Sequence, residues 1–270
     1  MRTSFVISAS PTKFSPITYG VDLEKAIRSL AGLGFDGVEL HVRDPKEVDL
    51  SLIKSVIGDC GLEVSAIGTG LAYVDDGLSF SNPNADIRHS AVQRIKDCID
   101  FASNLNALLI IGLVRGRTTA GVDKAQALAW IKEALGECLA FAEKKNVRIV
   151  IEPINRYETD LLNTASETID FIRQLQSLNI GLLLDSFHMN IEEPSIYESI
   201  RTAGNLLAHF HIVDSNRWAP GYGHLDFQQI IASLREIDYQ GYLSAEILPL
   251  PDSNTAAEKT IQTLRPLLQP

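Results

Sequence analysis

The sequence predicts one (β/α)₈ barrel (a TIM barrel) that occupies residues 1–270 as a single domain. The first observation is length, because 270 residues are close to the roughly 250 that such a barrel needs. The second is that short apolar runs alternate with helical patterns along the whole chain. The third is that SASPTKF, without a glycine-rich phosphate loop, follows the first run. This disfavours the main alternative, an open doubly wound sheet.

The predicted strands are continuous apolar runs rather than alternating ones, which is typical of a parallel sheet that helices cover. In chain order we expect them at 3–8, 37–42, 63–67, 107–112, 147–151, 180–184, 206–212 and 242–247. The helices that follow them are expected at 23–33, 47–60, 85–105, 123–145, 166–176, 195–203, 227–237 and 256–268. Glycines at 34 and 61 mark the ends of the first two helices. A longer connection at 68–84 precedes the third.

Composition excludes some functions and compartments. A formal net charge of -10 argues against a binder of nucleic-acid backbones, although an anionic small molecule stays compatible with it. Three scattered cysteines, Cys60, Cys98 and Cys138, indicate core thiols in a reducing compartment. The start lacks the pattern of a signal peptide, and no apolar stretch reaches the roughly 18 residues of a membrane span. We therefore expect a cytoplasmic protein with no nucleic-acid or membrane partner.

Four successive predicted strands each end on a residue that can bind a metal ion: Glu152, Asp185, His211 and Glu246. Chemistry in barrel enzymes lies at this carboxyl end of the strands. One such residue alone is more often a salt-bridge partner, a helix cap or a core histidine. Three acids at one mouth, however, would repel one another unless a cation lay among them. The tetrad predicts one divalent ion, with Mn²⁺ as first choice and Co²⁺ or Mg²⁺ as alternatives, because most donors are oxygens.

Such an ion would leave positions for the carbonyl and the neighbouring hydroxyl of an α-hydroxyketone. We predict Glu152 and Glu246 as the catalytic pair, since they follow strands three apart around the ring and can flank a substrate that lies over the barrel axis. One would remove the proton next to the ketone, giving a cis-enediolate, and the other would return a proton to the opposite face.

Five further residues are expected to bind substrate. Glu158, His188 and Arg217 follow strands five, six and seven, and they can hydrogen-bond hydroxyls and the carbonyl. Loop salt bridges or helix caps are the alternative for the first two. Arg115 and Arg117, in GLVRGR after strand four, can clamp a carboxylate or a phosphate. Their alternative is a solvated loop with surface ion pairs.

Long stretches of the chain resemble the xylose isomerase-like barrel superfamily, and within it the ketose 3-epimerases of tagatose, psicose and related sugars. They are IEPINRYETDLLNT at 151–164, LLDSFHMNIEE at 183–193, HFHIVDSNRWAPGYGHLDF at 209–227 and SAEILPLP at 244–251. The resemblance implies the metal ligands, catalytic pair and substrate-orienting trio named above, and often a dimer or tetramer. The segments 68–88 and 110–117 resemble instead a subgroup linked to keto-sugar acids, which includes epimerases of 5-keto-L-gluconate.

The sequence therefore predicts a divalent-metal-dependent 3-epimerase acting on a ketose or a keto-sugar acid. An aldose–ketose isomerase or a sugar dehydratase on the same barrel is the main alternative. A metal-dependent endonuclease is disfavoured by the charge of -10 and by only six histidines. A sugar-binding module without catalysis would not need two metal-bound glutamates on opposite sides of its ligand.

Overall fold

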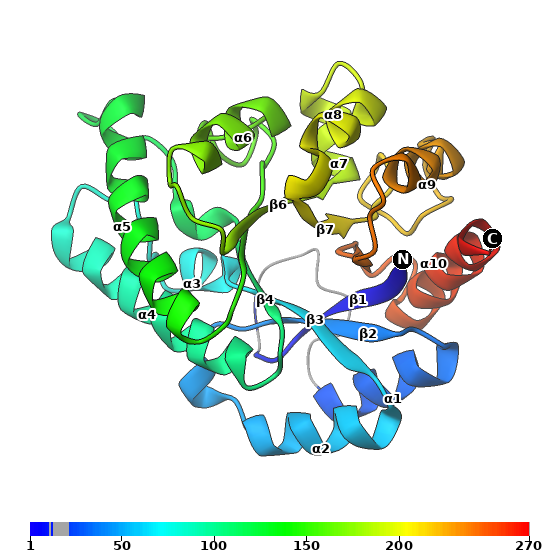
Figure 1. Ribbon diagram of the computed structural model, residues 1–270. Coiled ribbons are helices and arrows are strands. Elements are labelled where there is room, and N and C mark those ends of the chain that lie inside the picture. The colour runs from blue at the N-terminus through cyan, green and yellow to red at the C-terminus, as the bar shows by residue number, and fades with distance from the viewer. Residues whose placement is uncertain (11, 13–21, 270) are drawn as a thin grey trace.

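The computed structural model describes residues 1–10, 12 and 22–269, and its eight parallel strands form a closed barrel in chain order (Figure 1). The predicted fold class is confirmed. Part of the segment SASPTKF lies outside the described residues. The strands are β1 Arg2–Ser8, β2 Gly37–His41, β3 Glu63–Gly68, β4 Leu108–Ile111, β5 Ile149–Ile151, β6 Ile180–Asp185, β7 Leu207–His211 and β8 Tyr242–Ala245.

Helices surround the ring of strands (Figure 1). Their bounds agree with the predicted ones to within a few residues, except that the sequence analysis missed α3 and α7. The helices are α1 Leu23–Leu33, α2 Leu50–Cys60, α3 Gly70–Val74, α4 Ala85–Ser103, α5 Lys124–Lys144, α6 Ala165–Arg173, α7 Ser186–Glu192, α8 Ile196–Ala203, α9 Phe227–Glu236 and α10 Ser253–Leu268. None of the helices described is long and apolar enough to cross a membrane.

Side-chain caps fix where most helices begin. The carboxylate of Asp22 accepts the N–H of Lys25 at the start of α1, and the same kind of contact starts α2, α4 to α6 and α8 to α10. At the other end of α1, Gly34 takes a φ of 85°, a left-handed conformation that glycine adopts without strain. Local sequence signals of this kind explain why the element boundaries were predictable.

Alternating residues of each strand face the two sides of the barrel wall. On β4, Leu109 belongs to the large apolar cluster between strands and helices, whereas Ile110 belongs to a small separate cluster with residues of β3, β5 and β6. On β2, Val38 and Leu40 are likewise part of the large cluster. The residues that alternate with them, Glu39 and His41, are polar and buried, and they lie next to the site described below.

Candidate metal centre and active site

The four predicted metal-binding residues lie together at the carboxyl ends of β5 to β8. Glu152 and Glu246 directly follow β5 and β8, whereas Asp185 and His211 are the last residues of β6 and β7. These strands pair consecutively, so that their ends are neighbours. All four side chains are buried, and one ligand atom from each lies within 4.8 Å of the others.

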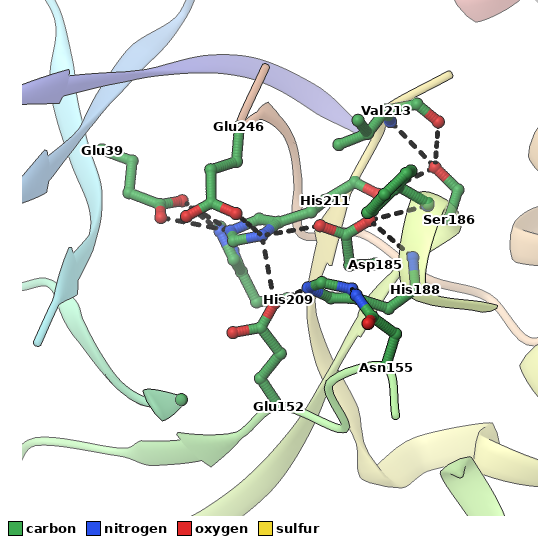
Figure 2. A network of polar contacts seen from close by, with 12 residues as sticks. Glu39, Glu152, Asn155, Asp185, Ser186, His188, His209, His211, Val213 and Glu246 are labelled. Atoms are coloured by element: carbon green, nitrogen blue, oxygen red, sulfur yellow. Dashed lines mark hydrogen bonds and ion pairs between the residues drawn. The ribbon is translucent and has the colours of Figure 1, made fainter. Parts of the chain in front are cut away.

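The contacts centre on the ring of His211 (Figure 2). Its Nδ1 lies 3.7 Å from Oε1 of Glu152, 3.6 Å from Oδ2 of Asp185 and 3.9 Å from Oε2 of Glu246. In Figure 2 the carboxylates of Glu152 and Glu246 approach the ring from opposite sides. Ligand atoms held about 2.1 Å from one common ion lie roughly 3 to 4 Å apart, so these separations suit a divalent ion.

The hydrogen bonding of the tetrad also fits an ion. Oε1 of Glu152, Oδ2 of Asp185 and Nδ1 of His211 are buried and have no hydrogen-bond partner among the described residues. Buried polar atoms nearly always have one. The three unpartnered atoms face a common centre. Atoms that bind one cation must be arranged in this way.

The two carboxylate oxygens of Asp185 have different roles, one at the start of α7 and one in the tetrad. Its Oδ1 accepts the N–H groups of Phe187 at 2.7 Å and His188 at 3.4 Å, and so caps the first turn of α7. Its Oδ2 is thereby left to face the tetrad. The cap holds one oxygen in place and so fixes the direction of the other.

Burial, together with repulsion among the acids, raises the pKa values of two of them. Burial raises the pKa of Glu152 well above its ordinary value, and the charges of Glu246 and Asp185 add to this although His211 opposes it. Burial likewise raises the pKa of Glu246, against the lowering effect of Arg217. A cation among these carboxylates would favour their charged forms.

A pocket of about 370 Å³ opens on the tetrad. The predicted substrate-orienting trio, Glu158, His188 and Arg217, lines it together with Glu152, His211 and Glu246. Gly112 forms part of the wall after β4. A Cβ atom at this position would lie 2.8 Å from Oε2 of Glu152, so a larger residue here would push the carboxylate of Glu152 aside.

His188 has a defined hydrogen-bonding state. Burial lowers its pKa to about 3, so the ring is neutral at physiological pH. The amide nitrogen of Asn155 lies 2.8 Å from Nδ1 of His188 and 2.8 Å from Oε1 of Glu158, and it can donate to both. Nη1 of Arg217, also a donor, lies 3.3 Å from Nε2 of the same ring. A neutral ring accepts at only one nitrogen, and the shorter contact, from Asn155, makes Nδ1 the acceptor and places the ring hydrogen on Nε2. Asn155 was not predicted as a site residue.

Arg217 is fixed beside one member of the proposed catalytic pair. It has a left-handed φ of 62°, and its backbone bonds to Asp214 and Leu248. Its Nη2 donates to Oε2 of Glu246 at 2.6 Å, and its guanidinium carbon lies 4.9 Å from the ring centre of Phe187. Arg217 therefore partly neutralises Glu246 in the pocket.

The two loop arginines do not line the pocket, and this corrects the predicted role of Arg115. Its fully buried guanidinium donates to the carbonyls of Gly112 at 2.8 Å, Leu161 at 3.2 Å and Leu162 at 3.3 Å. It thus joins the loops after β4 and β5 instead of facing a ligand. Arg117 is exposed and is not among the residues that line the pocket.

We expect Arg115→Met to destabilise the protein by about 3 kcal/mol or more, because three buried carbonyls would lose their donor. Urea unfolding of the ion-free protein measures this. Arg117→Met is the matched control, and its effect should stay within about 0.5 kcal/mol, as for exposed side chains in general. Equal stability of the two variants would contradict the joining role of Arg115.

Three buried residues beside the tetrad were missed as site residues: Glu39, His41 and His209. Glu39 accepts hydrogen bonds from His209 and His211, and His41 lies 3.4 Å from carboxylate oxygens of both Glu39 and Glu246. Burial opposes the charged form of Glu39. Nevertheless, electrostatic attraction to His211 and hydrogen bonds from the histidines hold its pKa well below the usual range. The available signals were the polar pairs in ELH and HFH, spaced by two within apolar strands.

Comparison with known proteins gives consistent matches over most of the chain. A family model described as xylose isomerase-like TIM barrel matches residues 27–267. A D-psicose 3-epimerase of Agrobacterium fabrum is 33% identical over 227 residues, which are 82% of this chain and 77% of that protein. A 3-dehydro-D-guloside 4-epimerase of Escherichia coli is 26% identical over 83% of this chain and 86% of that protein. A crystal structure of D-psicose 3-epimerase with D-tagatose, from Clostridium cellulolyticum H10, matches with a TM-score of 0.84 at 25% identity and covers 100% of both chains.

Proposed function

The chain belongs to the xylose isomerase-like TIM barrel family, and from this premise we propose that it is a metal-dependent sugar epimerase. It inverts the carbon next to a ketone in a keto sugar, as a 3-epimerase does. The observation that carries this proposal is the position of Glu152 and Glu246. They face each other across His211 in one pocket, where the donor set fits a divalent ion (Figure 2).

Inversion needs two proton-transfer groups on opposite faces of one carbon. When bound at the tetrad, the ion would act as a Lewis acid toward the ketone, and Mn²⁺ is our first choice for this oxygen-rich donor set. One glutamate accepts the proton from the carbon, which leaves a planar cis-enediolate. The glutamate on the other face then delivers a proton, so the configuration is inverted. Which of the two acts first depends on the epimer that is bound.

The trio around the pair orients the sugar. The Nε2–H of His188, fixed by Asn155, is a donor toward a substrate oxygen. Glu158 accepts from a sugar hydroxyl, and Arg217 holds Glu246 at 2.6 Å. All three groups line the pocket.

The charged residues that line the pocket indicate whether the sugar is neutral or carries a carboxylate. Arg217 is the one arginine among the described residues that line the pocket, and Glu246 already engages it. With Arg115 bound to backbone carbonyls, the described wall offers no spare arginine to a substrate carboxylate. We therefore place a neutral ketose first as substrate and a keto-sugar acid such as 5-keto-L-gluconate second.

Turnover in deuterated water tests the proposal. Mn²⁺-loaded protein is incubated with free ketoses and with keto-sugar acids, and the products are identified by NMR. We expect an epimer with one deuterium on the inverted carbon. An aldose product would show an isomerase, and a deoxy product would show a dehydratase. Turnover of phosphorylated sugars alone would overturn the substrate class.

A further inference from the structure

Glu39 forms a buried hydrogen-bonded triad with two histidines of β7. It lies on β2, has no exposed surface and does not line the pocket. Its carboxylate lies 2.8 Å from Nε2 of His209, and 3.1 and 3.2 Å from Nε2 of His211. Figure 2 shows the carboxylate on the side of the His211 ring that faces away from Asp185. A carboxylate this deep in a barrel is costly unless it is paired.

The chemistry of the triad fixes where the ring hydrogens lie. An ionised carboxylate can only accept hydrogen bonds, so the Nε2 atoms of both His209 and His211 must donate. In a neutral imidazole, Nδ1 of His211 then carries the lone pair. This is the atom that lies 3.7 Å from Glu152 and 3.6 Å from Asp185. Glu39 thus selects the ring form that can bind an ion at the tetrad.

We infer that Glu39 is a positioning residue, which holds the ring of His211 in the orientation and tautomer required of a metal ligand. His209 is its second donor and keeps the carboxylate from turning. The inference rests on the proposed function, because it needs an ion at Glu152, Asp185, His211 and Glu246. Glu39 itself contacts neither this ion nor the substrate.

The same triad has a competing interpretation, since Glu39, His209 and His211 are close enough to hold an ion of their own. The distances of 2.8 and 3.1 Å favour direct hydrogen bonds between the groups. The two interpretations differ in the number of ions bound per chain. One ion agrees with the positioning role, and two ions would overturn it.

Glu39→Gln tests the positioning role through metal affinity. The amide lacks the charge and presents N–H groups to one of the two rings, which favours the wrong tautomer. Competition with a chromophoric chelator for Co²⁺ or Mn²⁺ should show 10- to 100-fold weaker binding. Glu63→Gln is the matched control, because Glu63 begins β3 at the opposite end of the barrel. Its affinity should stay within about twofold of the parent.

The outcomes separate the two proposals. If the parent binds one ion and Glu39→Gln binds it equally well, the positioning role is wrong and the proposed function stands. If the parent binds no ion, both are wrong.

If Glu39→Gln does not fold, a measurement on the unaltered protein can test the positioning role of Glu39. Ring ¹⁵N–¹H correlations of ¹⁵N-histidine-labelled, Zn²⁺-loaded protein should show His209 and His211 both as Nε2–H tautomers. A hydrogen on Nδ1 of His211 would overturn the inference.

Discussion

Glu246→Gln is expected to lower kcat for epimerisation by about 10³- to 10⁴-fold, because it removes one of two proton-transfer groups. Gln keeps the shape of the side chain, and its carbonyl oxygen can still face the tetrad and accept from Arg217 at the place where Oε2 accepts at 2.6 Å. The variant also loses a charged metal ligand, so the ion must be kept at a saturating concentration. Under that condition the loss should fall on kcat, while sugar affinity measured by calorimetry changes much less. Steady-state kinetics of the Mn²⁺-loaded protein measure the effect.

Glu63→Gln again serves as the control, with kcat within about twofold of the parent. The same pair of variants separates an enzyme from a sugar-binding module. A module would bind sugar equally well with either residue at 246 and would show no turnover to lose. Full activity of Glu246→Gln would contradict the assignment of Glu246 to proton transfer.

Removal of the metal ion is expected to abolish turnover and to lower thermal stability. Without the ion, three buried carboxylates face one another and two of them have raised pKa values. An ion present at about 100 times its Kd would stabilise the folded state by about 2.7 kcal/mol. In a chain of this size this corresponds to a Tm increase of roughly 5 to 10 °C.

Dialysis against a chelator, followed by calorimetry and by assay with added ions, makes this measurement. Mn²⁺, and to different extents Co²⁺ or Mg²⁺, should restore both activity and Tm. Asp185→Asn, which weakens the tetrad, should show a smaller Tm increase on addition of ion. A chelated protein that keeps its activity and Tm would contradict a metal-dependent reaction.

The outline of the fold and the tetrad followed from the sequence because both depend on local patterns. Asp caps and C-terminal glycines mark the helix ends, and apolar runs mark the strands. The (β/α)₈ topology then brings the carboxyl ends of β5 to β8 together whatever the exact register. This is why Glu152, Asp185, His211 and Glu246 could be grouped before any distances were known.

The residues that were missed or misassigned depend on tertiary geometry. Glu39 and His209 come from strands that are not neighbours, and they meet only through the register and closure of the barrel. Arg115 lies in a loop near the mouth, as expected. The direction of its side chain depends on carbonyls at 161 and 162, where Leu162 has a left-handed φ of 54°. No sequence pattern around GLVRGR predicts that these carbonyls accept hydrogen bonds from Arg115.

Hydrogen exchange at the reacting carbon tests whether Glu152 and Glu246 act on opposite faces of one substrate. Glu152→Gln and Glu246→Gln are each incubated with either epimer in deuterated water, and NMR follows deuterium at that carbon. We expect slow exchange without inversion, with one variant exchanging one epimer and the other variant exchanging the opposite one. Loss of exchange from both epimers in one variant, with normal epimerisation in the other, would contradict this assignment.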